Sequence, residues 1–160
     1  MQKVTILCVG KLKEKFYLDA VAEYSKRLQR HCRLEILELP EQRLPDAPAQ
    51  GEIDAALERE AAAIREKLPK GCALVAMCIE GQLLSSEDLS RRVIRFSLEG
   101  KSHLVFLIGG SFGLHPSLKA QADLRLSMSP MTFPHHLARV MLLEQLYRAY
   151  QIQEGTRYHK

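Results

Sequence analysis

The sequence predicts an α/β fold in which a mostly parallel β-sheet carries helices on both faces. Two observations support this prediction. Short apolar runs alternate with longer segments of helical periodicity along the whole chain, and such alternation is typical of parallel sheets. In addition, several of the apolar runs are continuous, as expected for strands that are covered on both faces.

Strands are expected at five apolar runs. These runs are residues 4–9, 34–39, 73–79, 103–108 and 124–127. Glycine directly follows the first and the fourth run, and Pro40 follows the second. Because glycine and proline interrupt regular structure, they place the ends of these strands.

Helices are expected between the strands and after the last one. The segments are residues 13–30, 53–68, 86–99, 117–122 and 134–152, of which the fourth is only one or two turns. Ser85 or Ser86 can cap the third helix, and Pro134 suits the first position of the last. With 160 residues, no repeat and no long linker, residues 1–160 are expected to form a single domain.

Composition excludes several classes of protein. The formal net charge of +4 is a mild basic excess, which permits an RNA partner without indicating one. The four cysteines form no C-x-x-C pair and no ligand spacing for zinc, so no metal site is expected. The chain has no signal-like start and no apolar stretch approaching the roughly 18 residues of a membrane helix. A cytoplasmic location away from the membrane is therefore expected.

The first candidate ligand loop is residues 109–113, Gly-Gly-Ser-Phe-Gly, directly after the fourth predicted strand. Glycines let the backbone approach a ligand closely, and ligands of open α/β sheets bind beyond the carboxyl ends of strands. The segment is neither the dinucleotide motif nor a phosphate-binding P-loop. A tight turn without any ligand is the alternative interpretation.

The second candidate loop is residues 127–136, where small hydroxyl residues, two methionines and a phenylalanine precede a helix opened by proline. Such a loop can offer backbone amides and carbonyls to a flat heterocycle while Met and Phe pack against its faces. A helix cap with a hydrophobic staple around Phe133 is the alternative. His135 and His136 are adjacent and point to different faces, so they are not expected to bind one metal ion together.

The last helix and the tail form the third candidate. Apolar residues cover more than one stripe of the helix, which suggests burial on two sides and a partner subunit. Glu144 is expected in an internal ion pair, because a buried charge needs a partner. The terminal residues 157–160, Arg-Tyr-His-Lys, suit phosphate contacts and base stacking. A frayed, solvated terminus is the alternative.

Taken together, these stretches resemble the ribosomal RNA large subunit methyltransferase H family of the SPOUT superfamily. The matching segments are VTILCVGKLKEK, IEGQLLSSEDL, FLIGGSFGLH, LSMSPMTFPHHLARVMLLEQLYRAYQI and the terminal YHK. The resemblance extends over essentially the whole chain, and its most specific parts are FLIGG, MTFPH and YHK. One departure is Met77, where the family more often has leucine, a residue of similar volume.

The resemblance implies a SPOUT-type fold with a C-terminal trefoil knot, a homodimer, and S-adenosylmethionine as methyl donor without a metal. The residues it implies for donor binding lie at the end of the third strand and in the two candidate loops. They are Met77, Gly109, Met128, Ser129, Pro130, Met131, Thr132 and Phe133.

The resemblance also implies the reaction, which is methyl transfer to N3 of a pseudouridine in 23S ribosomal RNA of the assembled 70S ribosome. Because N3 must lose its proton, a base or a cation that stabilises the anion is useful. His159 is the first candidate for the base and Arg139 for the cation, with Tyr158 stacking or hydrogen bonding. His135 is an alternative base, and a structural role at the helix start is equally compatible with it.

A group of lysines near the end of the first strand, Lys11, Lys13 and Lys15, is expected to contact phosphates. A solvated helix start is the alternative.

Two other functions compete with methyl transfer. A non-catalytic ribosome-associated RNA-binding factor with a SPOUT-like fold would not bind the methyl donor, and the intact loops argue against it. A nucleotide-dependent oxidoreductase lacks its glycine motif in this chain.

Overall fold

The computed structural model describes residues 1–160 and contains one five-stranded sheet in the order β2-β1-β4-β3-β5. All four pairings between neighbouring strands are parallel, which confirms the predicted sheet. The strands are β1 (Lys3–Val9), β2 (Arg33–Leu39), β3 (Ala73–Leu83), β4 (His103–Ile108) and β5 (Leu124–Ser127).

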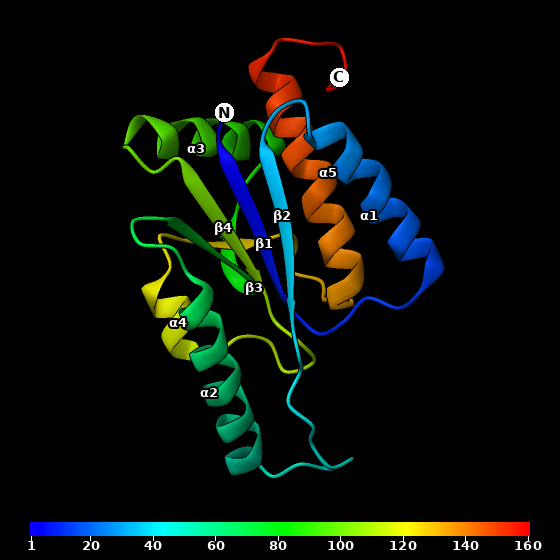
Figure 1. Cartoon of the computed structure of the whole chain (residues 1–160), viewed down its shortest axis with the longest axis vertical. Helices are drawn as coiled ribbons and strands as arrows, with labels where there is room; N and C mark the ends of the chain where they lie inside the picture. The colour runs from blue at the N-terminus through cyan, green and yellow to red at the C-terminus, as the bar shows by residue number, and fades with distance from the viewer.

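Helices cover both faces of the sheet, as predicted (Figure 1). They are α1 (Lys15–Leu28), α2 (Gln50–Lys67), α3 (Ser86–Leu98), α4 (Pro116–Gln121) and α5 (His135–Gln153). Helices α1, α3 and α5 lie on one face, with α5 in contact with both of the others, and α2 and α4 lie on the opposite face. None of the helices combines the length and the apolar composition needed to cross a lipid bilayer.

Two apolar cores result from the alternation of side chains along the central strands. In β1, Val4 and Ile6 belong to the core beneath α1, α3 and α5, whereas Leu7 belongs to the core beneath α2 and α4. All three side chains are fully buried. This explains the continuous apolar run in the sequence, because a strand covered on both faces needs apolar residues at every position.

Helix α5 begins one residue later than predicted, and its apolar surface is covered within the same chain. Pro134 is the residue before the helix, because its ψ of 139° is extended, and the helix begins at His135. Contacts with α1, α3 and the sheet account for the wide apolar surface of α5 within a single chain. That width therefore does not by itself require a partner subunit.

Strand β3 is longer than predicted and carries a shift of register. Met77 and Gln82 both pair with Leu126 of β5, so residues 78–81 form an extra segment between them. At Gly81 a Cβ atom would lie 2.8 Å from the carbonyl carbon and oxygen of Arg125. Only glycine permits this close crossing of β3 and β5. The trefoil knot implied by the resemblance is compatible with this arrangement and stays a prediction.

Candidate functional site

A cavity of about 730 Å³ opens at the carboxyl end of β4 and beside the middle of β3. Its walls come mainly from residues 77–80, from residues 110–114 and from residues 128–135. The two candidate loops of the sequence therefore meet residues 77–80 of β3 at one place. This is the edge of an open α/β sheet where ligands bind.

Most of the residues expected to bind the donor line this cavity. They are Met77, Met128, Ser129, Met131, Thr132 and Phe133. Gly109 and Pro130 are not among its lining residues. A Cβ atom on Gly109 would lie 2.4 Å from the backbone of Gly113, so the absence of a side chain at Gly109 lets the turn close.

A carboxylate that no sequence pattern indicates, Glu41, supports the glycine turn. The backbone N–H of Ser111 donates a hydrogen bond of 2.7 Å to Oε1 of Glu41. A Cβ atom at Gly110 would lie 2.5 Å from the same Oε1, so a side chain there would displace the Glu41 carboxylate. Glu41 comes from the proline-containing loop after β2, and nothing in that loop indicates a partner 70 residues away.

The second loop is held in shape by its own hydroxyl groups. Ser127 Oγ donates to the carbonyl of Ser129 at 3.0 Å, and the backbone N–H of Met131 donates to Ser129 Oγ at 3.0 Å. The Met131 side chain is 71% exposed at the cavity. The loop is therefore shaped before any ligand arrives, which lowers the entropy cost of binding.

His135 lines the cavity at the start of α5. Burial lowers the pKa of its imidazole, and the neighbouring His136 lowers it further. The ring is therefore neutral near pH 7, in a state that can accept a proton or a hydrogen bond. This agrees with its position as an alternative base and equally with a structural role at the helix start.

An ion pair spans the wall of the same cavity. Lys119 Nζ of α4 lies 2.6 Å from Oε1 of Glu80, and both residues line the cavity. The hydrogen bond from Lys119 lowers the pKa of Glu80 and keeps the carboxyl group ionised. Sequence reasoning missed both residues, because their 39-residue separation gives no local pattern.

Arg139, the candidate cation, is 2% exposed in the first turns of α5. Its Nη1 lies 2.7 Å from Oε2 of Glu38, and its Nη2 donates to the carbonyl of Gly10 at 3.4 Å. Glu38 also accepts the backbone N–H of Leu12 at 2.8 Å. The guanidinium thus joins α5 to the ends of β1 and β2, and its charge is neutralised there.

The tail folds against the other end of α5. The ring of Tyr158 packs edge-on against Tyr147 at 4.8 Å, with the guanidinium of Arg148 4.8 Å from its centroid. Two contacts hold the ring of His159: Nε2 lies 2.6 Å from Glu87 Oε1 and Nδ1 lies 3.1 Å from Arg148 Nη1.

Glu144 forms the expected internal ion pair, with Arg148 at 2.6 Å.

The structure does not bring the three candidate catalytic residues together. Arg139 and Arg148, the latter beside His159, are nine residues apart on α5, which corresponds to about 14 Å along the helix.

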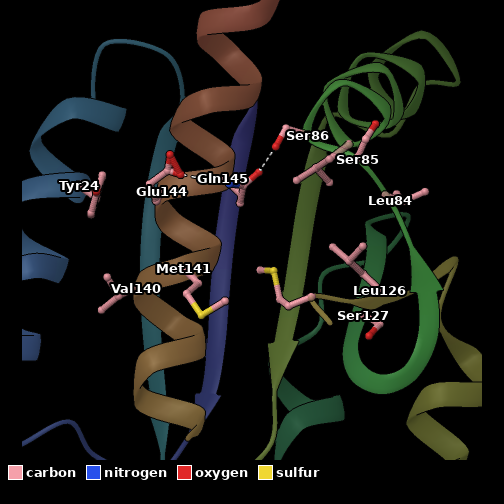
Figure 2. A pocket seen from close by; sticks show the side chains of 12 residues that line it. Tyr24, Leu84, Ser85, Ser86, Leu126, Ser127, Val140, Met141, Glu144 and Gln145 are labelled. Carbon is pink, nitrogen blue, oxygen red and sulfur yellow. Dashed lines mark hydrogen bonds between the residues drawn. The ribbon is translucent and has the colours of Figure 1, made fainter. Parts of the chain in front are cut away.

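A second cavity of about 520 Å³ lies between the second candidate loop, residues 127–136, and the tail. Figure 2 shows Met141 and Glu144 of α5 on one side, and Leu126 and Ser127 of β5 on the other. Met128 lines both cavities, and the hydroxyl of Tyr158 lies 3.5 Å from Glu144 Oε1. The smaller cavity therefore adjoins the larger one at Met128 and the tail at Glu144.

The lysine group after β1 is on the surface. Lys11, Lys13 and Lys15 are exposed, and Lys15 forms an ion pair of 2.8 Å with Asp19 one helical turn away. Their exposure is compatible with phosphate contacts and with a solvated helix start, so both interpretations stay open.

Comparisons with known proteins add a family to this geometry. Residues 2–159 match the family described as predicted SPOUT methyltransferase. A protein of Acetivibrio thermocellus named ribosomal RNA large subunit methyltransferase H is 45% identical, with 99% of both chains covered. A relative of the same name from Streptococcus uberis is 42% identical, again over 99% of both chains.

A solved structure described as a probable methylase family protein from Haemophilus influenzae has a similar fold. The TM-score is 0.54 at 13% identity, with 99% of this chain and 71% of that chain covered. At this level of identity the likeness concerns the fold alone.

Proposed function

The chain belongs to the SPOUT methyltransferase family, with relatives named ribosomal RNA large subunit methyltransferase H, and from this premise we propose its reaction. It transfers the methyl group of S-adenosylmethionine to N3 of a pseudouridine in 23S ribosomal RNA of the assembled 70S ribosome, in the cytoplasm. The observation that carries the proposal is the convergence of both candidate loops on one cavity at the carboxyl edge of the sheet.

The cavity suits the proposed donor. Apolar side chains of Met77, Ile108 and Phe133 line it and can enclose a flat adenine, while backbone groups of residues 128–133 can recognise its edge. The donor, when bound, supplies a methyl group on a sulfonium that is already electrophilic. The protein then has to position the two reactants and remove one proton.

The proton on N3 must leave before the nitrogen can form its bond to the methyl carbon. His159 is proposed as the base, with Tyr158 stacking on or hydrogen bonding to the target base. The nucleophilic N3 gains the methyl group, the sulfonium–carbon bond breaks, and S-adenosylhomocysteine and a proton are released. Arg139 is proposed to stabilise negative charge, although its pairing with Glu38 and its burial favour a positioning role.

The target base is proposed to occupy the smaller cavity. That cavity adjoins the donor cavity at Met128 and the tail at Glu144, so a base there has both reaction partners as neighbours. A homodimer is proposed as well, in which a second copy packs against one wall of this cavity and leaves room for the base. Half-buried Val140 and Met141 on its wall offer apolar surface for that contact.

Calorimetric titration with S-adenosylmethionine tests the proposal. Ala138 lines the larger cavity, so Ala138→Leu should fill part of it and reduce donor affinity at least tenfold, on the order of 1.4 kcal/mol. Ala22→Leu, at an exposed position of α1, is the matched control and should bind like the wild type.

Methyl transfer to 70S particles is the second half of the test. Transfer by the wild type that depends on His159 supports the proposed role of the tail. Absence of both donor binding and transfer would favour the alternative, a non-catalytic ribosome-associated RNA-binding factor. Sedimentation analysis gives the oligomeric state independently of activity.

A further inference from the structure

We propose that Glu80 recognises the ribose hydroxyls of the methyl donor and that Lys119 positions Glu80 for this contact. The inference rests on the proposed function, because it assigns a part of the donor to one wall of the larger cavity. Neither residue belongs to the two candidate loops, and both come from segments that the sequence analysis left without a function.

The position of Glu80 follows from the register shift in β3. Met77 and Gln82 share one partner in β5, so the chain between them bends away from the sheet. The close crossing at Gly81 holds the base of this extra segment against β5. Glu80 thereby lies on the cavity wall beside α4 instead of pairing within the sheet.

The ion pair fixes the carboxylate further. Lys119 Nζ is 2.6 Å from Oε1, and its side chain is only 25% exposed, against 56% for Glu80. Oε2 of Glu80 accepts no hydrogen bond from another residue. An oriented carboxylate with one free oxygen thus faces the cavity, and an ionised carboxylate can only accept hydrogen bonds.

Charge favours hydroxyl donors over a cationic group of the ligand. Lys119 already neutralises Glu80, so a second ammonium group at this carboxylate would be repelled by the lysine. Neutral O–H groups avoid this repulsion and form short, strong hydrogen bonds to an ionised oxygen. Two neighbouring hydroxyls, as on a ribose, suit one carboxylate best.

The distribution of burial along the cavity agrees with this placement. Ile108 and Leu114 on its wall are each 4% exposed and suit the adenine ring. Glu80 is much more exposed, so it belongs to the open part of the cavity. The sugar joined to a buried base would be directed toward that open part.

Binding of S-adenosylhomocysteine and of its 2′-deoxy and 3′-deoxy analogues, measured by calorimetry, tests the inference. For the wild type, loss of a recognised hydroxyl should weaken binding roughly tenfold to a hundredfold. Glu80→Ala should bind S-adenosylhomocysteine about as weakly as the wild type binds the deoxy analogue, and should no longer discriminate between them. Lys119→Met should reduce the discrimination without abolishing it.

Glu58→Ala is the matched control, because Glu58 is an exposed glutamate of α2 outside the cavity. It should retain the full discrimination, and unchanged melting temperatures should show that all variants are folded. Equal discrimination by the wild type and Glu80→Ala, or none by the wild type, overturns the inference alone. No binding of S-adenosylmethionine or S-adenosylhomocysteine by the wild type overturns the proposed function as well.

Discussion

The two ends of α5 are built in different ways. At its first turns, Arg139 is buried and paired with Glu38, and the second candidate loop leads directly into the helix. At its other end, His159 and Tyr158 are held by partly exposed contacts with Glu87 and Arg148. The difference teaches that the start of α5 is anchored in the folded core, whereas the tail is attached to the surface.

The energies of these contacts differ accordingly. A buried ion pair is costly to break, because one partner is left charged without compensation. Exposed ion pairs and cation–π contacts each contribute at most about 1 kcal/mol. Changes at the first end should therefore reduce stability, and changes at the tail should reduce activity while stability stays nearly constant.

The largest effect is expected for Arg139→Met. Removing the guanidinium leaves Glu38 without its cation and should lower the free energy of unfolding by about 3 kcal/mol, the lower end for buried pairs because Glu38 is partly exposed. Urea denaturation measures this difference.

Two further variants control that prediction. Arg148→Met removes the partly buried pair with Glu144 and should cost less, about 1–2 kcal/mol, because Glu144 keeps hydrogen bonds from Gln145 and Tyr158. Adding Glu38→Gln to Arg139→Met should recover part of the lost stability, because no unpaired charge is then left. Equal costs for Arg139→Met and Arg148→Met would contradict the contrast between the two ends.

The second effect concerns the glycine turn at the donor cavity. A Cβ atom on Gly109 meets the backbone of Gly113, so Gly109→Ala should cost about 1–3 kcal/mol and should also abolish measurable donor binding. The control is Gly51→Ala in α2, where a Cβ atom would meet nothing within 4 Å. This variant should keep the stability and the donor affinity of the wild type. Normal donor affinity in Gly109→Ala would show that the turn does not shape the cavity.

A smaller loss of stability is expected when the pH is lowered. The pKa of Glu38 lies below its usual value: burial raises it, but the hydrogen bonds from Arg139 and Leu12 outweigh that effect. A lowered folded pKa contributes stability above the unfolded value, about 4.3, that is lost as the pH falls through the folded pKa. The wild type should therefore lose more stability below about pH 4 than the double variant Arg139→Met/Glu38→Gln. Parallel pH profiles in thermal denaturation would contradict this.

The smallest change in stability is expected for His159→Ala. Its contacts are at the surface, so the free energy of unfolding should change by less than about 1 kcal/mol. Methyl transfer should nevertheless fall at least a hundredfold if His159 is the base. Glu87→Gln separates the roles, because it removes the partner of His159 while keeping the ring. Full transfer by His159→Ala across pH would exclude the proposed base.

Sequence reasoning succeeded where the signal is local. The apolar runs identified every strand, and glycine or hydroxyl residues marked both loops that line the larger cavity. It underestimated β3, because Gly81 and Gln82 interrupt the apolar pattern although the strand continues to Leu83. Local patterns are produced by the periodicity of one element, and periodicity is what a single sequence displays.

Contacts between distant segments were not predictable. Arg139 and Glu38 are separated by 101 residues, and Ser111 and Glu41 by 70. Such pairs depend on the strand order and on how loops meet at the sheet edge. The separation of Arg139 from the tail, in contrast, follows from the length of the predicted helix, because Arg139 lies near its start and the tail follows its end.

The central position of α5 has a consequence for biosynthesis. Leu142, Leu143 and Leu146 are fully buried between α1, α3 and the sheet, yet they are translated after every strand and helix that they contact. While the chain is still growing, the apolar sides of α1 and α3 have no helix between them. We therefore expect this face of the nascent chain to stay open until α5 has been synthesised and has left the ribosome.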